Sequence, residues 1–276
     1  MFKKFFIILF TILLLTSCNF FQPKTSVIRI KGSDTMLGLI EILAREYMKL
    51  NPNVAIYVDG GGSKNGIASL TSKEIDIAMV SRLLTPNEVA MFAMENHSIG
   101  ISYLIAKDAI SIYINPENRV KDFTIDELRR IFTCKINNWK ELGGFDHVIN
   151  LHIRNPNSGT YYYFQQIVLN GESFCPAASS ESNTNKLVGK IAKDKYAIGF
   201  GGIGFNDGVE HAKVNGIEPT EENVRKDLYP LSRYLYFITL KQPEGAVKSF
   251  IDWTLSHYAQ SLIKQSGYVP IWSITY

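Results

Sequence analysis

Arg154, Ser158 and Thr160 stand close together in a segment whose residue types suit the binding of an oxyanion. Residues 148–153 alternate between apolar and polar, which predicts a buried strand before this segment, and residues 161–169 are predicted to form a helix after it. The backbone N–H groups and the dipole of a first helical turn favour a negative ion, and arginine adds a planar fork of donors. The simpler interpretation, a capping serine beside a surface arginine, stays open for this segment alone.

Three further segments carry hydroxyls or glycines directly after a predicted strand. The strands are expected at residues 27–30, 54–58 and 74–80, and a helix is expected at residues 36–50 after the first of them. Ligands of α/β proteins bind off the carboxyl ends of strands, so four such ends favour an oxyanion site over four unrelated helix caps. The residues singled out in these three segments are Ser33, Asp34, Thr35, Ser63, Ser81 and Arg82.

Predicted strands and helices alternate throughout, which places the chain in the α/β class with mostly parallel sheets. Thr85 and Thr124 each begin a capping box, and residues 246–265 show the spacing of one last amphipathic helix.

Gly199, Gly201 and Gly204 match the pattern of a dinucleotide site. The polar turn that follows leaves no helix where a pyrophosphate would need one, so that site is excluded.

The N-terminus has the shape of a signal peptide: a short basic region, an apolar run over residues 5–15, and Leu15-Thr16-Ser17-Cys18. This ending resembles the bacterial lipobox, which implies cleavage before Cys18, lipidation of Cys18 and a polar tether after it. An ordinary signal peptide and an uncleaved anchor are the alternatives.

Charge and cysteine content exclude some classes and leave one question open. The chain has 29 basic and 26 acidic side chains, and because Lys3 and Lys4 lie in the leader, the mature net charge is +1, too small for a nucleic-acid footprint. Cys134 and Cys175 could form a disulfide in an exported protein, but the sequence does not decide whether they do.

Six motifs occur in a fixed order between about residue 27 and the C-terminus: Gly32-Ser33-Asp34-Thr35; Gly60-Gly61-Gly62-Ser63 with Gly66-Ile67; Asp76-Ile77-Ala78 with Ser81-Arg82; residues 124–144 with Trp139; Arg154 with Ser158-Gly159-Thr160; and Tyr229-Pro230-Leu231-Ser232-Arg233. In this order they resemble the periplasmic phosphate-binding protein of bacterial phosphate ABC importers, a type II solute-binding protein family. Each motif is weak alone, whereas the ordered combination is specific.

The resemblance implies two α/β lobes with a ligand cleft between them and two crossing strands, near residues 105–108 and 230–233. The implied organisation is a signal peptide and tether over residues 1–25, a first lobe from residues 26–107 plus 232–276, and a second lobe from residues 108–231.

The resemblance also implies a set of phosphate ligands. One position departs from the family, because well-known members carry an acidic residue where this chain has Arg82. That carboxylate accepts the proton of hydrogen phosphate, and Asp34 is the nearest motif residue that could replace it. The implied phosphate-binding residues, with Asp34 included, are Ser33, Asp34, Thr35, Ser63, Ser81, Arg82, Arg154, Ser158, Gly159 and Thr160.

We therefore expect an extracytoplasmic lipoprotein, held on the cell membrane by a lipid at Cys18, that binds inorganic phosphate and delivers it to the permease of an ABC transporter. It is expected to be a monomer without cofactor, metal or nucleic acid and not an enzyme, since the five histidines form no ligand-spaced pair. A binding protein for sulfate or molybdate, a phosphatase using His152 as a base, and a lipoprotein that binds a partner protein are the alternatives.

Overall fold

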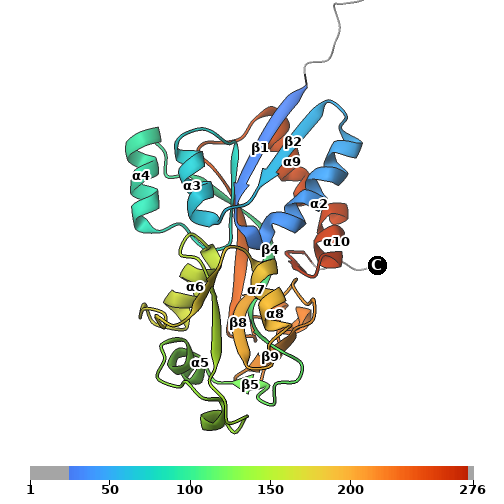
Figure 1. The fold of residues 1–276 in the computed structure, drawn as a ribbon. Helices are drawn as coiled ribbons and strands as arrows, with labels where there is room; N and C mark the ends of the chain where they lie inside the picture. The colour runs from blue at the N-terminus through green and yellow to red at the C-terminus, as the bar shows by residue number, and fades with distance from the viewer. Residues whose placement is uncertain (1–24, 273–276) are drawn as a thin grey trace, which may run out of the picture.

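The computed structural model describes residues 25–272 of the 276-residue chain, which form two lobes stacked end to end (Figure 1). The predicted signal peptide and Cys18 lie outside the described residues. Within residues 25–272, no helix is both long and apolar enough to cross a bilayer.

The first lobe is built on strands in the order β2-β1-β3-β10-β4, of which β4 (Ile101–Ile114) continues into the second lobe. β1 pairs in parallel with both β2 and β3, as expected for strands that are joined by helices. β3 is buried at every residue, which fits an interior strand covered on both faces. The elements of this lobe are β1 (Ser26–Gly32), α2 (Asp34–Leu50), β2 (Val54–Asp59), α3 (Ser63–Thr71), β3 (Ile77–Val80), α4 (Pro86–Asn96), β10 (Ser232–Thr239), α9 (Gly245–Thr254), α10 (His257–Gln265) and β11 (Val269–Pro270).

The second lobe continues the strand order as β4-β8-β6-β7, and β6 pairs in parallel with both β7 and β8. A short pair, β5 with β9, closes its far end. The elements of this lobe are β5 (Asp122–Phe123), α5 (Ile125–Phe132), η2 (Trp139–Leu142), β6 (Asn150–Arg154), α6 (Gly159–Ile167), β7 (Ser179–Glu181), α7 (Thr184–Ile191), β8 (Ala197–Gly202), β9 (Glu210–Val214) and α8 (Glu221–Arg225).

Two antiparallel strands connect the lobes. β4 (Ile101–Ile114) is a single strand of 14 residues that pairs with β10 in the first lobe and with β8 and β9 in the second. Every antiparallel pair between the described strands involves β4 or β10, so the sheets are mixed where the chain crosses and parallel away from it. The predicted lobe boundaries fall inside β4 and at the start of β10, and they stay a prediction.

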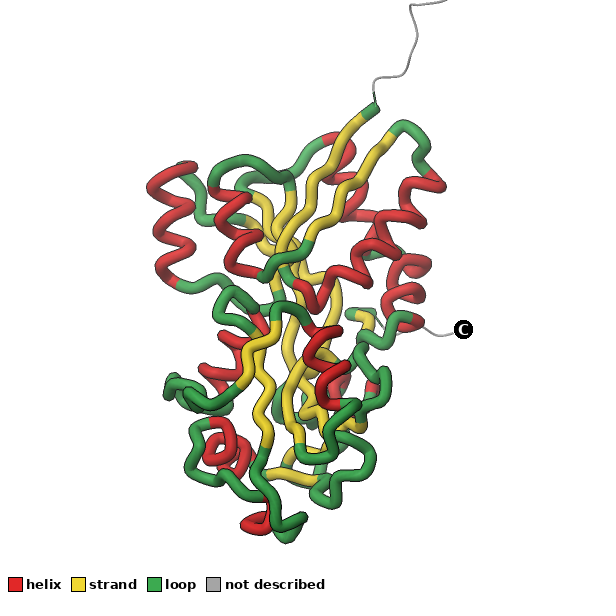
Figure 2. The backbone as a smooth tube through the Cα atoms, in the orientation of Figure 1, coloured by secondary structure: helices red, strands yellow, loops and turns green. Residues whose placement is uncertain are grey.

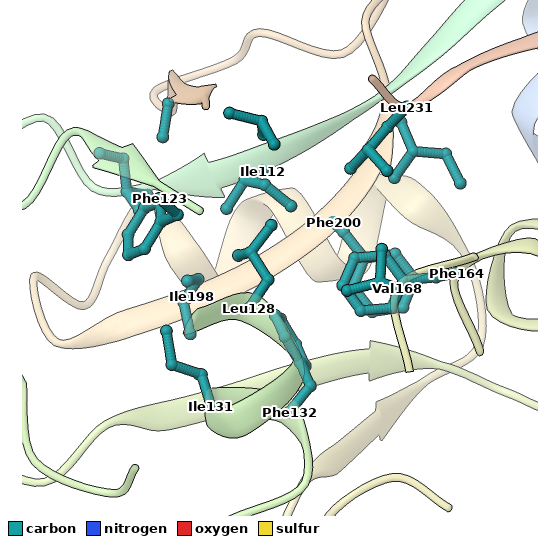
Figure 3. Close-up of a cluster of buried hydrophobic side chains, with 14 of the residues drawn as sticks. Ile112, Phe123, Leu128, Ile131, Phe132, Phe164, Val168, Ile198, Phe200 and Leu231 are labelled. Carbon is teal, nitrogen blue, oxygen red and sulfur yellow. The ribbon is translucent and has the colours of Figure 1, made fainter. Parts of the chain in front are cut away.

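Aromatic packing in the second lobe anchors the helix that follows Arg154. The ring of Phe164, on α6, stacks on Phe200 of β8 with centroids 3.8 Å apart, and Phe132 of α5 meets both rings edge-on at 4.9 and 5.3 Å (Figure 3). Such pairs add about 0.5–1.5 kcal/mol each beyond the area that they bury. The start of α6 is therefore held in a fixed place against the sheet.

Local signals in the sequence explain most of the element boundaries, with one exception. The capping boxes predicted at Thr85 and Thr124 are both present. The single last helix predicted over residues 246–265 is wrong: α9 ends at Thr254, and Ser256 caps a separate helix, α10. Ser256 can start a new helix within the apolar pattern, because its side chain accepts a hydrogen bond from a backbone N–H group of the first turn of α10.

Cys134 and Cys175 form a disulfide with their Cα atoms 5.2 Å apart, which answers the question that the sequence left open. The bond joins the segment after α5 to the segment before β7, on the flank of the aromatic cluster.

Candidate functional site

Arg154 is the last residue of β6, and Ser158 is the N-cap of α6, so the segment between them turns directly into a helix N-terminus. Ser158 Oγ accepts from the backbone N–H groups of Thr160 and Tyr161, at 3.2 and 3.4 Å. Ser158 therefore has the capping role of the simpler interpretation. These capping bonds use the lone pairs of Ser158 Oγ, so the hydroxyl proton remains available to donate to another group.

Three serines of the first lobe gather at the carboxyl ends of β1 and β3 and the start of α3. Ser33 Oγ donates to Ser81 Oγ at 3.0 Å, and Ser63 Oγ lies 3.4 Å from Ser81 Oγ. All three side chains are buried. The three predicted ligand segments of the first lobe, which contain Ser33, Ser63 and Ser81, thus meet at one point.

The helix start of the second lobe faces these serines. A side chain at Gly159 would lie within 2.6 Å of Ser81 Oγ and still closer to Ser63, so only glycine fits there. Thr160 Oγ1 is 2.9 Å from Thr35 Oγ1 of the first lobe. The first turns of α2 and α6 therefore lie side by side between the lobes (Figure 2).

Arg154 is almost fully buried, at 1% exposed, and reaches across the lobe interface. Its Nη2 lies 2.7 Å from Asp34 Oδ2, and its Nη1 donates to Thr184 Oγ1 at 2.7 Å. Burial lowers the pKa of the guanidinium, and the charge of Asp34 opposes that effect. The Nε group of Arg154 is buried without a hydrogen-bond partner in the protein, so one strong donor is left for another group.

Asp34 neither caps α2 nor stands free. Oδ1 accepts from the backbone N–H of Gly61 at 2.9 Å, and Oδ2 takes the ion pair with Arg154. Ser33 occupies the N-cap position of α2 without a side-chain cap bond. Asp34 thus joins the first loop, the glycine-rich loop and the arginine of the other lobe.

The terminal nitrogens of Arg82 are held by another residue. They form a bidentate pair with Glu88 of α4, at 2.7 and 2.6 Å. The guanidinium lies 4.9 Å from the ring centroid of Tyr162 on α6, a cation–π contact between the lobes. Its Nε is buried without a partner, as in Arg154, so a donor remains although the fork is occupied.

Two residues that the sequence did not predict as ligands, Arg233 and Asp108, also lie at the site. They face each other where β10 and β4 cross, and their ion pair is buried, with N–O distances of 2.9 and 2.6 Å. The sequence does contain a signal for this pair: each residue is a charged residue in an apolar strand, and such residues are rarely buried without a partner. Arg233 closes the last of the six motifs, yet it was not included among the ligands.

A groove of about 680 Å³ runs beside the site between α2 and α7. Its lining includes Asp34 and Thr184, the two side chains that hold Arg154.

His152, the base of the alternative phosphatase interpretation, faces Glu181, with Nδ1 3.4 Å from Oε1. Among residues 25–272 no group of three histidine, cysteine or acidic side chains could hold a metal ion.

The fold and the site together define a class: two α/β lobes, joined by crossing strands, that bring donors from both lobes to one buried point. A family model described as the PBP superfamily domain matches residues 21–257. The phosphate-binding protein PstS of Bacillus subtilis is 32% identical over 258 residues, which cover 91% of this chain and 82% of that protein. The chain belongs to the PBP superfamily and, within it, to the family of phosphate-binding proteins PstS.

Other relatives agree with this assignment. The phosphate-binding protein PstS of Borreliella burgdorferi is 28% identical over 284 residues, with 98% of this chain and 99% of that protein covered. A substrate-binding protein assigned to phosphate ABC transport in Clostridium perfringens, solved with bound phosphate, has a TM-score of 0.83 at 29% identity and covers 90% of this chain and 100% of its own. These relatives carry the names of binding proteins and not of enzymes.

Proposed function

We propose that this chain binds inorganic phosphate between its lobes and delivers it to the permease of an ABC transporter. The observation that carries the proposal is Arg154: a guanidinium that is 1% exposed, has an unpartnered Nε, and contacts Asp34 of one lobe and Thr184 of the other. Buried donors are costly unless they are satisfied, and an oxyanion accepts from several donors at once. The names of the relatives point to the same ion.

The proposed ligands divide into two charged donors and a set of neutral donors. Arg154 supplies the charge through Nε, and Asp34 holds its fork in place. Arg82 has only Nε to offer, because Glu88 occupies its terminal nitrogens. The neutral donors are Ser33, Thr35, Ser63, Ser81, Ser158, Gly159 and Thr160.

Equilibrium dialysis against radioactive phosphate tests this function. Protein that has been stripped of ligand by unfolding and refolding should retain labelled phosphate, and excess unlabelled phosphate should displace it. Sulfate and molybdate serve as competitors, since a binding protein for another oxyanion would release the label to one of them more readily than to phosphate. Retention of no label would overturn the proposal.

We also propose that the protein acts as a monomer on the extracytoplasmic side of the membrane, held by a lipid on Cys18. The support is the lipobox-like sequence before Cys18, because residues 1–24 lie outside the described structure. In cells given radioactive palmitate, the wild-type chain should be labelled and a Cys18→Ala variant should not. Equal labelling of both would remove the lipid anchor from the account.

A further inference from the structure

Arg233 stands where the two lobes join. It is the second residue of β10 and lies directly opposite Asp108 of β4 in the antiparallel pair. Both side chains are buried, at 3% exposed for Arg233 and 0% for Asp108. Nε and Nη2 of Arg233 both donate to Asp108 Oδ2, and Asp108 Oδ1 accepts from the backbone N–H of Ile203.

The remaining N–H groups of Arg233 turn away from Asp108 toward the proposed phosphate ligands. Nη1 donates to Thr160 Oγ1 at 2.9 Å and to the carbonyl oxygen of Ser81 at 3.4 Å. Nη2 lies 3.5 Å from Thr35 Oγ1. One side chain of a crossing strand therefore contacts ligand segments of both lobes.

These contacts limit the directions in which the Thr160 hydroxyl can donate its proton. A hydroxyl has one proton and two lone pairs, and Arg233 occupies one lone pair of Thr160 with a strong donor. Because the Thr160 proton cannot point at the Nη1 donor, it is directed away from Arg233, to the side where Thr35 Oγ1 lies at 2.9 Å and either hydroxyl can donate. Without Arg233, the same hydroxyl could turn and present a lone pair to the anion, which is repulsive.

We propose that Arg233 is a positioning residue for phosphate: held by Asp108, it orients the Thr160 hydroxyl as a donor and ties that donor to the crossing strands. The inference rests on the proposed phosphate function. Arg233 acts through Thr160 and is not itself placed as a phosphate ligand.

A double-mutant cycle on the full mature chain distinguishes this role from a purely structural one. Arg233→Lys keeps a positive charge opposite Asp108 but lacks the second arm that reaches Thr160. Thr160→Val removes the hydroxyl at nearly constant shape. Phosphate affinity is measured by calorimetry for both single variants and for the double variant, and thermal unfolding is measured in parallel.

We expect Arg233→Lys to weaken phosphate binding about tenfold in the wild-type background, because a charge-assisted hydrogen bond is lost, and less than about threefold when Thr160 is already valine. Arg225→Lys is the matched control. Arg225 pairs with Glu221 on α8 at 2.6 Å, so the same substitution there should leave affinity unchanged. Equal factors in both backgrounds would show that Arg233 supports only the fold and would overturn the inference.

A second measurement needs no arginine variant and applies if Arg233→Lys does not fold. In protein with nitrogen-labelled arginine, phosphate should slow the solvent exchange of the Arg233 side-chain N–H signals by magnetic resonance, and this slowing should be absent from Thr160→Val. The same response in both proteins would contradict the inference. Wild-type protein that binds no phosphate would instead overturn the proposed function, so the two failures are distinguishable.

Discussion

Each arginine at the site faces a carboxylate of its own, so the guanidinium charges are balanced before any anion arrives. Buried charges of one sign are strongly unfavourable, and pairing removes most of that cost. In the proposed site, phosphate would then be stabilised mainly by oriented donors: hydroxyls, helix N-termini and the unpartnered Nε groups. The three pairs are Arg154 with Asp34, Arg82 with Glu88, and Arg233 with Asp108.

The pair between Arg82 and Glu88 predicts a pH dependence of stability. Burial alone would raise the pKa of Glu88, but hydrogen bonds from Arg82 and Thr85 outweigh it and leave the pKa below its ordinary 4.5. A carboxyl with a lowered folded-state pKa stabilises the fold above its unfolded-state pKa, and that contribution is lost as pH falls through the folded-state value.

We therefore expect Glu88→Gln to lower the free energy of unfolding at pH 7, and the difference from wild type to shrink as pH falls below 4.5. Urea unfolding between pH 3 and 7 measures it. Glu95→Gln, an exposed glutamate on the same helix, should show no comparable difference. A difference for Glu88→Gln that is constant over the whole range would contradict the role assigned to this pair.

Asp34 predicts how the site separates phosphate from sulfate. A carboxylate beside an anion is repulsive unless a proton lies between them, and hydrogen phosphate can supply that proton whereas sulfate cannot. We expect Asp34→Asn to narrow the ratio of phosphate to sulfate affinity in competition titrations. Asp59→Asn, an exposed aspartate paired with Lys31 at 3.8 Å, is the control and should leave the ratio unchanged. An undiminished preference for phosphate would exclude Asp34 as the selectivity element.

The sequence predicted which residue types gather at the site better than it predicted their partners. Ser33, Ser63 and Ser81 could be placed together because each follows a strand in a parallel sheet. The capture of Arg82 by Glu88 could not be foreseen, because Glu88 already had a complete local role in its capping box. Arg233 lay in a recognised motif, but its reach toward Thr160 depends on how the two crossing strands pair.

At the scale of elements, the contact between the glycine-rich loop and the loop before α6 sets how closely the lobes approach. Gly62 has a φ of +94°, and a side chain there would lie 2.6 Å from the carbonyl oxygen of Asn157 in the other lobe. The same carbonyl accepts from the backbone N–H of Lys64, at the start of α3. The helix N-terminus of one lobe is thus capped by the loop of the other.

We expect Gly62→Ala to weaken phosphate binding, because the added methyl group obstructs this approach, although Gly62 is not among the proposed ligands. Gly143→Ala is the control for a positive φ without obstruction: its φ of +78° and ψ of +10° lie in the left-handed helical region, where a side chain costs about 1–2 kcal/mol, and no atom lies within 4 Å of the added group. Gly62, with a ψ of 152°, lies in a region that costs a side chain more, so the thermal unfolding of each variant is compared with its affinity. Phosphate titrations and thermal unfolding of both variants measure the effect. Equal affinity of the two variants would show that this contact does not limit closure.

Local signals in the sequence also determined how well each element was predicted. Capping boxes and apolar spacing located α4 and α5, because these signals act within one turn. The length of β4 was not predictable, since its two halves pair with different strands in different lobes. The break between α9 and α10 was not predicted, because a serine can lie inside a continuous helix or cap a new one, and only the packing of the helices distinguishes the two.

The proposed site, with donors from both lobes around one ion, implies a hinge between the lobes. Only β4 and β10 and the segments next to them connect the lobes along the described chain, so bending there opens the site. Phosphate should favour the closed form, because only that form offers both sets of donors. Small-angle scattering should show a smaller radius of gyration with phosphate than without it. An unchanged profile at a phosphate concentration known to saturate the protein would contradict hinge closure.

Arg154 is the residue on which the proposed binding of phosphate between the lobes depends most. Calorimetric titration of ligand-stripped wild type, Arg154→Lys and Arg154→Ala with phosphate measures the contribution of this arginine to binding. We predict tight binding by wild type and a loss of roughly two decades in affinity for Arg154→Ala, because a buried charge-assisted donor is removed. Arg154→Lys should recover only part of that loss, since lysine restores the charge but not the planar fork. Binding of phosphate by Arg154→Ala with the affinity of wild type would contradict the account.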